Sequence, residues 1–188
     1  RELIRVAEHD DLHAAERLTT APPRLPQRAV DAIHEVGIDH RDLVDDEGWQ
    51  HRIWTRHFEG KRDEGCDILL LLDGNSCFPL ALQATQARSL ERSLLLVGIG
   101  FPEMDRRAIV ARRYRHLTSD APPAAIPMPA PSQCFETGGW EAYLAFLTAH
   151  LLPEIERRYG PGNRTIFGHS LSGYFALRAL LAGSRIAN

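Results

Sequence analysis

Residues 165–175 read TIFGHSLSGYF, a short β-branched and aromatic run that leads into a turn rich in glycine and serine. An apolar run rich in alanine and leucine follows, to about Leu181. This order predicts a strand, a sharp turn and a helix, with Ser170 at the tip of the turn. A turn of this kind strains the serine backbone, so the residues two positions away on each side must be small. Gly168 meets this requirement, and Ser172 stands where glycine is usual.

The Gly-x-Ser-x-Ser pattern has two interpretations. It can be a nucleophile elbow, in which a strained turn presents a serine hydroxyl for attack on a carbonyl. It can also be an ordinary turn that joins a buried strand to a helix. The pattern alone has low specificity, but a strand and a helix flank it in the required order. We therefore interpret Ser170 as a nucleophile.

The composition is that of one soluble globular domain: 188 residues, 44% hydrophobic and 25% charged. A net charge of -3 gives no support for nucleic acid or an anionic membrane as a partner, and no apolar run is long enough to span a bilayer. The three cysteines form neither a metal-ligand spacing nor an even disulfide set, and the histidines of residues 1–48 lack a tight ligand spacing. We expect no metal, reduced thiols and a cytoplasmic location, although the chain begins with Arg1 rather than Met.

Apolar runs alternate with helical patterns along the rest of the chain. This predicts a mainly parallel sheet with helices on both faces, an α/β fold whose site lies at the carboxyl ends of the strands. Residues 73–75 (Asp-Gly-Asn), the loop after residue 100 and Ser170 fall on that edge. Residues 39–48 are expected to be a loop and 101–138 to carry little regular structure, and Pro153 should bend or break a helix over 140–159. The expected strands cover residues 49–56, 66–72, 94–99 and the run before the elbow, with a helix over 76–89.

Several separated segments resemble one family in order and spacing: LLLLDGNSCF, LLLVGIGFPE, RRYRHLT, GGWEAYLAFLTAHLLPEIERRY and RTIFGHSLSGYFALRALL. They are similar to the esterase D-like α/β-hydrolases, most of all to the siderophore esterases of the enterochelin and bacillibactin type. The resemblance covers residues 49–188, which it identifies as the N-terminal part of an α/β-hydrolase domain. Residues 1–48 remain an unassigned extension. The family implies ester hydrolysis by a serine, without a metal or an organic cofactor.

Four further residues are candidates for the site. The backbone N–H of Leu171, at the start of the elbow helix, is placed to hold an oxyanion. By resemblance, the N–H of Asn75 is the second oxyanion donor. Arg112 and Arg113 align with the arginine stretch of the family, and an arginine fork suits an anionic ester substrate. Each arginine could equally be solvated or form a structural ion pair.

A general base and an acid should follow the nucleophile in this fold. The eighteen residues after Ser170 contain neither histidine nor carboxylate, so we expect both groups to lie beyond Asn188. His169 should point away from the serine hydroxyl, and His116 is expected on a loop at the same edge. Neither histidine is expected to act as the base.

Three functions follow from this interpretation. The first is a serine ester hydrolase acting on siderophore-type esters, with a small-molecule substrate as its partner. The second is an acyltransferase or a thioester or feruloyl esterase on the same scaffold. The third is a catalytically incomplete fragment or a non-catalytic binding module in which the elbow is idle.

Overall fold

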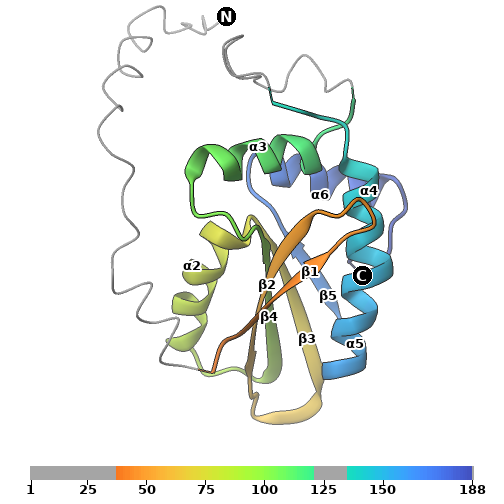
Figure 1. Cartoon of the computed structure of the whole chain (residues 1–188). Coiled ribbons are helices and arrows are strands. Elements are labelled where there is room, and N and C mark those ends of the chain that lie inside the picture. Colours follow the sequence, from red (N-terminus) through yellow and green to blue (C-terminus); the bar gives the residue numbers. More distant parts are fainter. Residues whose placement is uncertain (1–36, 121–134, 188) are drawn as a thin grey trace, which may run out of the picture.

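The computed structural model describes residues 37–120 and 135–187, which form a sheet flanked by helices (Figure 1). The expectations for residues 1–36 and 121–134 lie outside the described residues. Within the described part, the strands are β1 (Asp39–Val44), β2 (Gln50–Phe58), β3 (Arg62–Leu72), β4 (Arg92–Gly100) and β5 (Arg164–Phe167). The helices are α2 (Gly74–Gln86), α3 (Arg106–Leu117), α4 (Trp140–Ala145), the π-helical η3 (Phe146–Leu151), α5 (Leu152–Tyr159) and α6 (Leu171–Leu181).

The sheet has the strand order β1-β2-β4-β3-β5. β3 runs parallel to β4 on one side and to β5 on the other, whereas the β1–β2 and β2–β4 pairs are antiparallel. The α/β class is therefore confirmed, and the sheet is mixed, with its antiparallel pairs toward the β1 edge. Since β3 and β5 are adjacent and parallel, the turns that follow them lie at the same edge of the sheet.

Both faces of the central strands are buried, as their unbroken apolar runs predict. Successive side chains alternate between two cores because a strand has a period of two. The larger core, under α4, η3, α5 and α6, takes from β3 and β4 the residues Ile68, Leu70, Leu72, Leu95, Val97 and Ile99. The smaller core, under α2, consists of Leu71, Phe78 and Leu96.

The prediction of a loop over residues 39–48 is wrong, because Asp39–Val44 form β1. Only the end of that segment turns, where Asp45 accepts hydrogen bonds from the backbone N–H groups of Glu47 and Trp49. β1 is an edge strand with largely exposed, charged side chains, one of which, Asp42, pairs with Arg52 of β2. Charge of this kind protects a sheet edge and hides the apolar alternation by which a strand is recognised.

The prediction of little regular structure over residues 101–138 is also wrong, because Arg106–Leu117 form α3. Asp105 caps this helix by accepting a hydrogen bond from the N–H of Ala108 at 2.8 Å. Arginine and alanine are strong helix formers, so the signals were present but lacked a clear apolar face. α3 lies beside α4 and α6, near the edge where β3 and β4 end (Figure 1).

The long helix over residues 140–159 is present, and its hydrogen bonding changes just before Pro153, as predicted. The N–H of Leu152 donates to the carbonyl of Leu147, five residues back, at the end of the π-helical segment η3. Proline has no N–H to donate, which explains a disturbance at this point. Across the part of the chain that the structure describes, none of the helices combines the length and the apolar character that crossing a bilayer requires.

Candidate active site

Ser170 lies between β5 and α6 and is exposed. Its backbone has φ 56° and ψ -119°, a conformation that non-glycine residues rarely adopt. Strain of this size costs about 1–3 kcal/mol and persists only where the surrounding structure imposes it. The strand, turn and helix predicted from the sequence are therefore present, with the serine at the strained position.

The residues around Ser170 explain how the turn is held. A Cβ atom on Gly168 would lie 2.4 Å from the carbonyl oxygen of Ser172, so only glycine fits there. The hydroxyl of Ser172, which is 0% exposed, donates to the carbonyl of His169 at 2.9 Å and accepts from its N–H at 2.8 Å. Ser172 therefore braces the turn, a role that the sequence pattern did not reveal.

The turn after β3 places Asn75 at the same edge as Ser170, because β3 and β5 are neighbours. Asp73 adopts a left-handed conformation (φ 54°), and a Cβ on Gly74 would lie 2.7 Å from the backbone nitrogen of Ile99. Asn75 and Leu171 both lie in the first turn of a helix, where backbone N–H groups have no intrahelical acceptor. Both N–H groups are thus in positions that favour an anion.

The side chain of Asn75 fixes this turn to the end of β4. Its amide donates to the carbonyl of Phe101 at 2.8 Å and accepts from the N–H of Phe101 at 2.8 Å. Gly100 leaves room for the contact, since a Cβ there would lie 2.3 Å from Oδ1 of Asn75. No pattern in the sequence indicated this pair of hydrogen bonds.

Arg113 of α3 reaches the same turn. Its guanidinium donates to both carboxylate oxygens of Asp73, at 2.7 and 3.0 Å. A bidentate pair of this kind is directional as well as attractive, so it restrains the left-handed Asp73. The Arg113 side chain keeps 26% of its surface exposed. Its role in binding a substrate stays a prediction.

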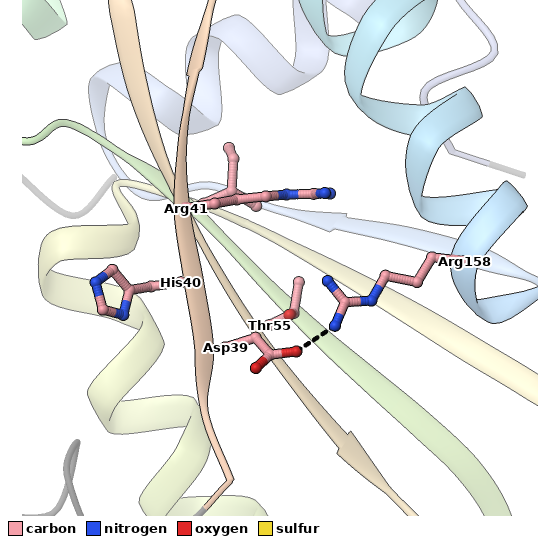
Figure 2. A pocket seen from close by; sticks show the side chains of 6 residues that line it. Asp39, His40, Arg41, Thr55 and Arg158 are labelled. Atoms are coloured by element: carbon pink, nitrogen blue, oxygen red, sulfur yellow. Dashed lines mark hydrogen bonds and ion pairs between the residues drawn. The ribbon is translucent and has the colours of Figure 1, made fainter.

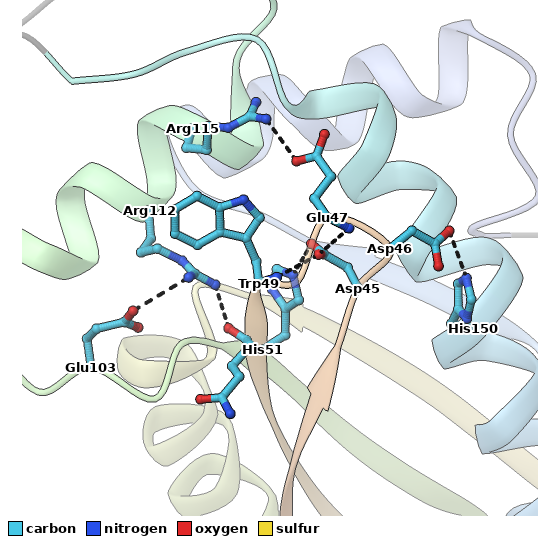
Figure 3. Close-up of polar contacts among 10 residues, drawn as sticks. Asp45, Asp46, Glu47, Trp49, His51, Glu103, Arg112, Arg115 and His150 are labelled. Carbon is cyan, nitrogen blue, oxygen red and sulfur yellow. Dashed lines mark hydrogen bonds and ion pairs between the residues drawn. The ribbon is translucent and has the colours of Figure 1, made fainter.

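Arg112 is buried, and its contacts are internal (Figure 3). Its guanidinium lies 4.5 Å from the ring centroid of Trp49 and 5.0 Å from that of Phe101. It donates to the carbonyl of Gln50 and pairs with Glu103 at 3.6 Å. Burial lowers the pKa of Arg112, while Glu103 opposes this change. These contacts support the structural alternative for Arg112; its proposed contact with substrate remains untested.

His116 lies on α3 and not on a loop, so that prediction is wrong. Its imidazole is buried beside the rings of Trp49, His51 and Tyr143. Burial, helped by the nearby His51 and Arg112, lowers the pKa of His116 to about 3. A buried imidazole with so low a pKa is a poor proton acceptor at neutral pH.

A cavity of about 150 Å³ lies elsewhere, over β1 and β2 (Figure 2). It is lined by Asp39, His40, Arg41, Ile53, Thr55 and Arg158. Arg158 pairs with Asp39 at its rim (Figure 2). None of the predicted site residues lines this cavity, so it is separate from the edge that carries Ser170.

A partly parallel sheet covered by helices on both faces, with a strained serine between a strand and a helix, defines an α/β-hydrolase-type fold. The chain belongs to the esterase family described as "Putative esterase", whose model matches residues 54–184. The resemblance seen in the sequence motifs is therefore confirmed.

Two curated relatives are siderophore esterases by name. The chain is 35% identical to the ferri-bacillibactin esterase BesA of Bacillus subtilis over 126 residues, which are 62% of this chain and 43% of that protein. It is 28% identical to the siderophore enterobactin esterase of Emericella nidulans over 131 residues, 62% of this chain and 42% of that protein. The matched segment thus spans less than half the length of each relative.

Solved structures share the fold. The BES protein from Bacillus cereus has a TM-score of 0.63 at 23% identity, covering 77% of this chain and 58% of that one. The siderophore hydrolase EstB from Aspergillus nidulans has a TM-score of 0.63 at 22% identity, covering 89% of this chain and 57% of that one.

Proposed function

We propose that the protein is a serine carboxylic-ester hydrolase in which Ser170 is the nucleophile. One observation carries the proposal: the strained, exposed Ser170 sits between β5 and α6, next to the Asn75 turn of the adjacent strand. Folded chains retain such strain chiefly where it serves a function. The family match to residues 54–184 supports the same reaction class.

In this reaction the hydroxyl oxygen of Ser170 attacks the ester carbonyl carbon and its proton passes to a general base. The carbonyl oxygen becomes an oxyanion, and the backbone N–H groups of Leu171 and Asn75 donate to it. The tetrahedral intermediate then expels the alcohol, which takes up a proton, and leaves an acyl-enzyme. Water hydrolyses that ester and returns Ser170 to its starting state. His116 does not serve as the base, because it is buried and its pKa is lowered to about 3.

The substrate class proposed is a siderophore-type ester, by analogy with the relatives named for bacillibactin and enterobactin. Esters of this type that carry catecholates are anionic. Arg113 supplies a partly exposed cation at the edge that carries Ser170, and its ion-pair partner Asp73 is 14% exposed. With 26% of its side chain exposed against 8% for Arg112, Arg113 is the better candidate for contact with an anionic group.

The nucleophile is tested by labelling the full-length protein with a fluorophosphonate probe. We expect labelling that disappears in Ser170→Ala and persists in Ser89→Ala, an exposed serine in the loop after α2. Labelling that survives in Ser170→Ala would refute the assignment. A comparison of a catecholate-bearing serine trilactone with simple aryl and feruloyl esters tests the substrate. A preference for the feruloyl or aryl ester would reject the siderophore class and leave the nucleophile intact.

A further inference from the structure

A group of three metal-ligating side chains lies away from Ser170, where the β1–β2 hairpin meets α3. Asp45 directly follows the strand β1, His51 belongs to β2 and His116 to α3. All three residues are buried, and one donor atom from each lies within 4.8 Å of the others. Among the residues that the structure describes, this is the one such group of three or more histidine, cysteine or acidic side chains.

The carboxylate of Asp45 is oriented toward the histidines. Its Oδ1 accepts hydrogen bonds from the backbone N–H groups of Glu47 and Trp49, at 3.0 and 2.8 Å. Its Oδ2 faces Nε2 of His51 at 2.8 Å (Figure 3). Hydrogen bonds that orient a carboxylate in this way are typical of the outer shell of a metal site.

The imidazoles provide a second and independent observation. His116 is 1% exposed and His51 is 0% exposed. Nε2 of His116 and Nδ1 of His51 have no hydrogen-bond partner among the described residues. An unsatisfied buried polar atom of this kind costs about 1–3 kcal/mol, so an occupant that takes an electron pair from His116 Nε2 would be favoured.

The surroundings hold the two imidazoles in place and keep them neutral. The ring of Phe146 stacks on His51 with centroids 4.4 Å apart, and Trp49 meets His116 edge-on at 5.6 Å. Burial lowers the pKa of both histidines, and only a neutral imidazole can donate an electron pair to a metal. The nearby cation, Arg112, is paired with Glu103, so their charges balance each other. The carboxylate of Asp45 therefore gives the three ligands a net charge of one negative unit.

We propose that Asp45, His51 and His116 bind one divalent transition-metal ion, with zinc as the expected ion, which joins the β1–β2 hairpin to α3. Imidazole and carboxylate together suit zinc, whereas magnesium and calcium prefer oxygen ligands throughout. Ligands at about 2.0–2.2 Å from zinc lie roughly 3–3.5 Å apart, so the three donor atoms, which lie within 4.8 Å of one another, would draw closer together on binding. On binding, His51 would coordinate through Nε2 and carry its proton on Nδ1. Because the ligands are buried, the ion would enter as the chain folds.

This site is structural and independent of the proposed ester hydrolysis. The test is to refold the full-length protein from denaturant in buffered zinc, after removing metal with a chelator, and to measure bound zinc by equilibrium dialysis. We expect His51→Gln and His116→Gln each to bind one ion fewer per chain than the unsubstituted protein. Their affinity at this site should fall by more than about 100-fold, the upper end of the loss for an outer-shell change.

His150→Gln is the matched control, because His150 also pairs with an aspartate, Asp46, at 3.4 Å but is exposed (Figure 3). It should bind as much zinc as the unsubstituted protein. Equal zinc content in all four proteins would overturn the proposal. If the buried variants do not fold, refolding the unsubstituted protein from denaturant in a series of cobalt concentrations decides. Saturable binding of one ion with the intense visible absorption of a low-coordinate site supports the proposal, and its absence rejects it.

Discussion

The pair of hydrogen bonds between the Asn75 side chain and the Phe101 backbone leads to a prediction about both stability and catalysis. Replacing Asn75 by alanine removes two hydrogen bonds of 2.8 Å and leaves the N–H and carbonyl of Phe101 without these partners. At about 0.5–1.5 kcal/mol for each bond, the free energy of unfolding should fall by about 1–3 kcal/mol. Asn75 is half-buried, so water can replace part of the loss, which favours the lower half of this range.

The same change should slow catalysis without removing the proposed oxyanion donor, which is a backbone N–H. Loss of a whole oxyanion donor costs about 100- to 1000-fold in kcat, and a displaced donor should cost less, about 10- to 100-fold. We expect this fall in kcat with little change in KM for a neutral aryl ester, alongside the loss of stability measured by urea unfolding. The neighbouring exposed residue provides the control, Ser76→Ala, which should change neither quantity. An Asn75→Ala variant that is destabilised as expected, but whose kcat stays within about twofold of that of the unsubstituted protein, would refute this prediction. It would show that the hydrogen bonds to Phe101 do not position the proposed oxyanion donor.

Three further predictions concern other parts of the site. Ser172→Ala should lower the free energy of unfolding by about 1–3 kcal/mol, because it removes both hydrogen bonds to the His169 backbone, and urea unfolding measures this. An unchanged midpoint would show that the hydroxyl does not brace the turn. Arg113→Ala should raise the KM for an anionic ester more than the KM for a neutral ester. Arg107→Ala, at an exposed site on the same helix, is the control and should change neither KM value. Equal effects of Arg113→Ala on both esters would indicate that Arg113 only positions the turn at Asp73. Folding lowers the pKa of His116 from 6.5 to about 3, so the unfolded chain binds a proton at this imidazole more readily than the folded chain. The free energy of unfolding is therefore highest with respect to this group above pH 6.5 and falls as the pH drops from 6.5 toward 3. With metal removed by a chelator, His116→Gln should flatten the dependence of stability on pH in this window by up to about 1.4 kcal/mol per pH unit, and an unchanged slope would contradict the assigned environment.

The local signals in the sequence were sufficient for much of the fold. Unbroken apolar runs identified β3 and β4, and the strand, turn and helix around Ser170 are where the pattern placed them. These elements are recognisable because burial on both faces requires apolar residues at every position. β1 and α3 were missed because they lack such apolar runs. Their sequences are charged, and each is held in place by partners, β2 for one and the neighbouring helices for the other.

The residues of the candidate site also fall into two groups, those that the sequence reveals and those that only the structure reveals. Gly168 and Ser170 could be recognised from sequence, because a strained turn imposes residue types at fixed spacings of two positions. The braces around that turn join residues distant along the chain: Arg113 contacts Asp73 forty positions away, and Asn75 contacts Phe101 across twenty-six. No periodicity records such contacts, because they depend on where the ends of separate strands and α3 meet. The sequence by itself determined the position of the serine and its strand, turn and helix. Only the tertiary structure decided which side chains hold the turn at Asn75 and that Arg112 and His116 are buried.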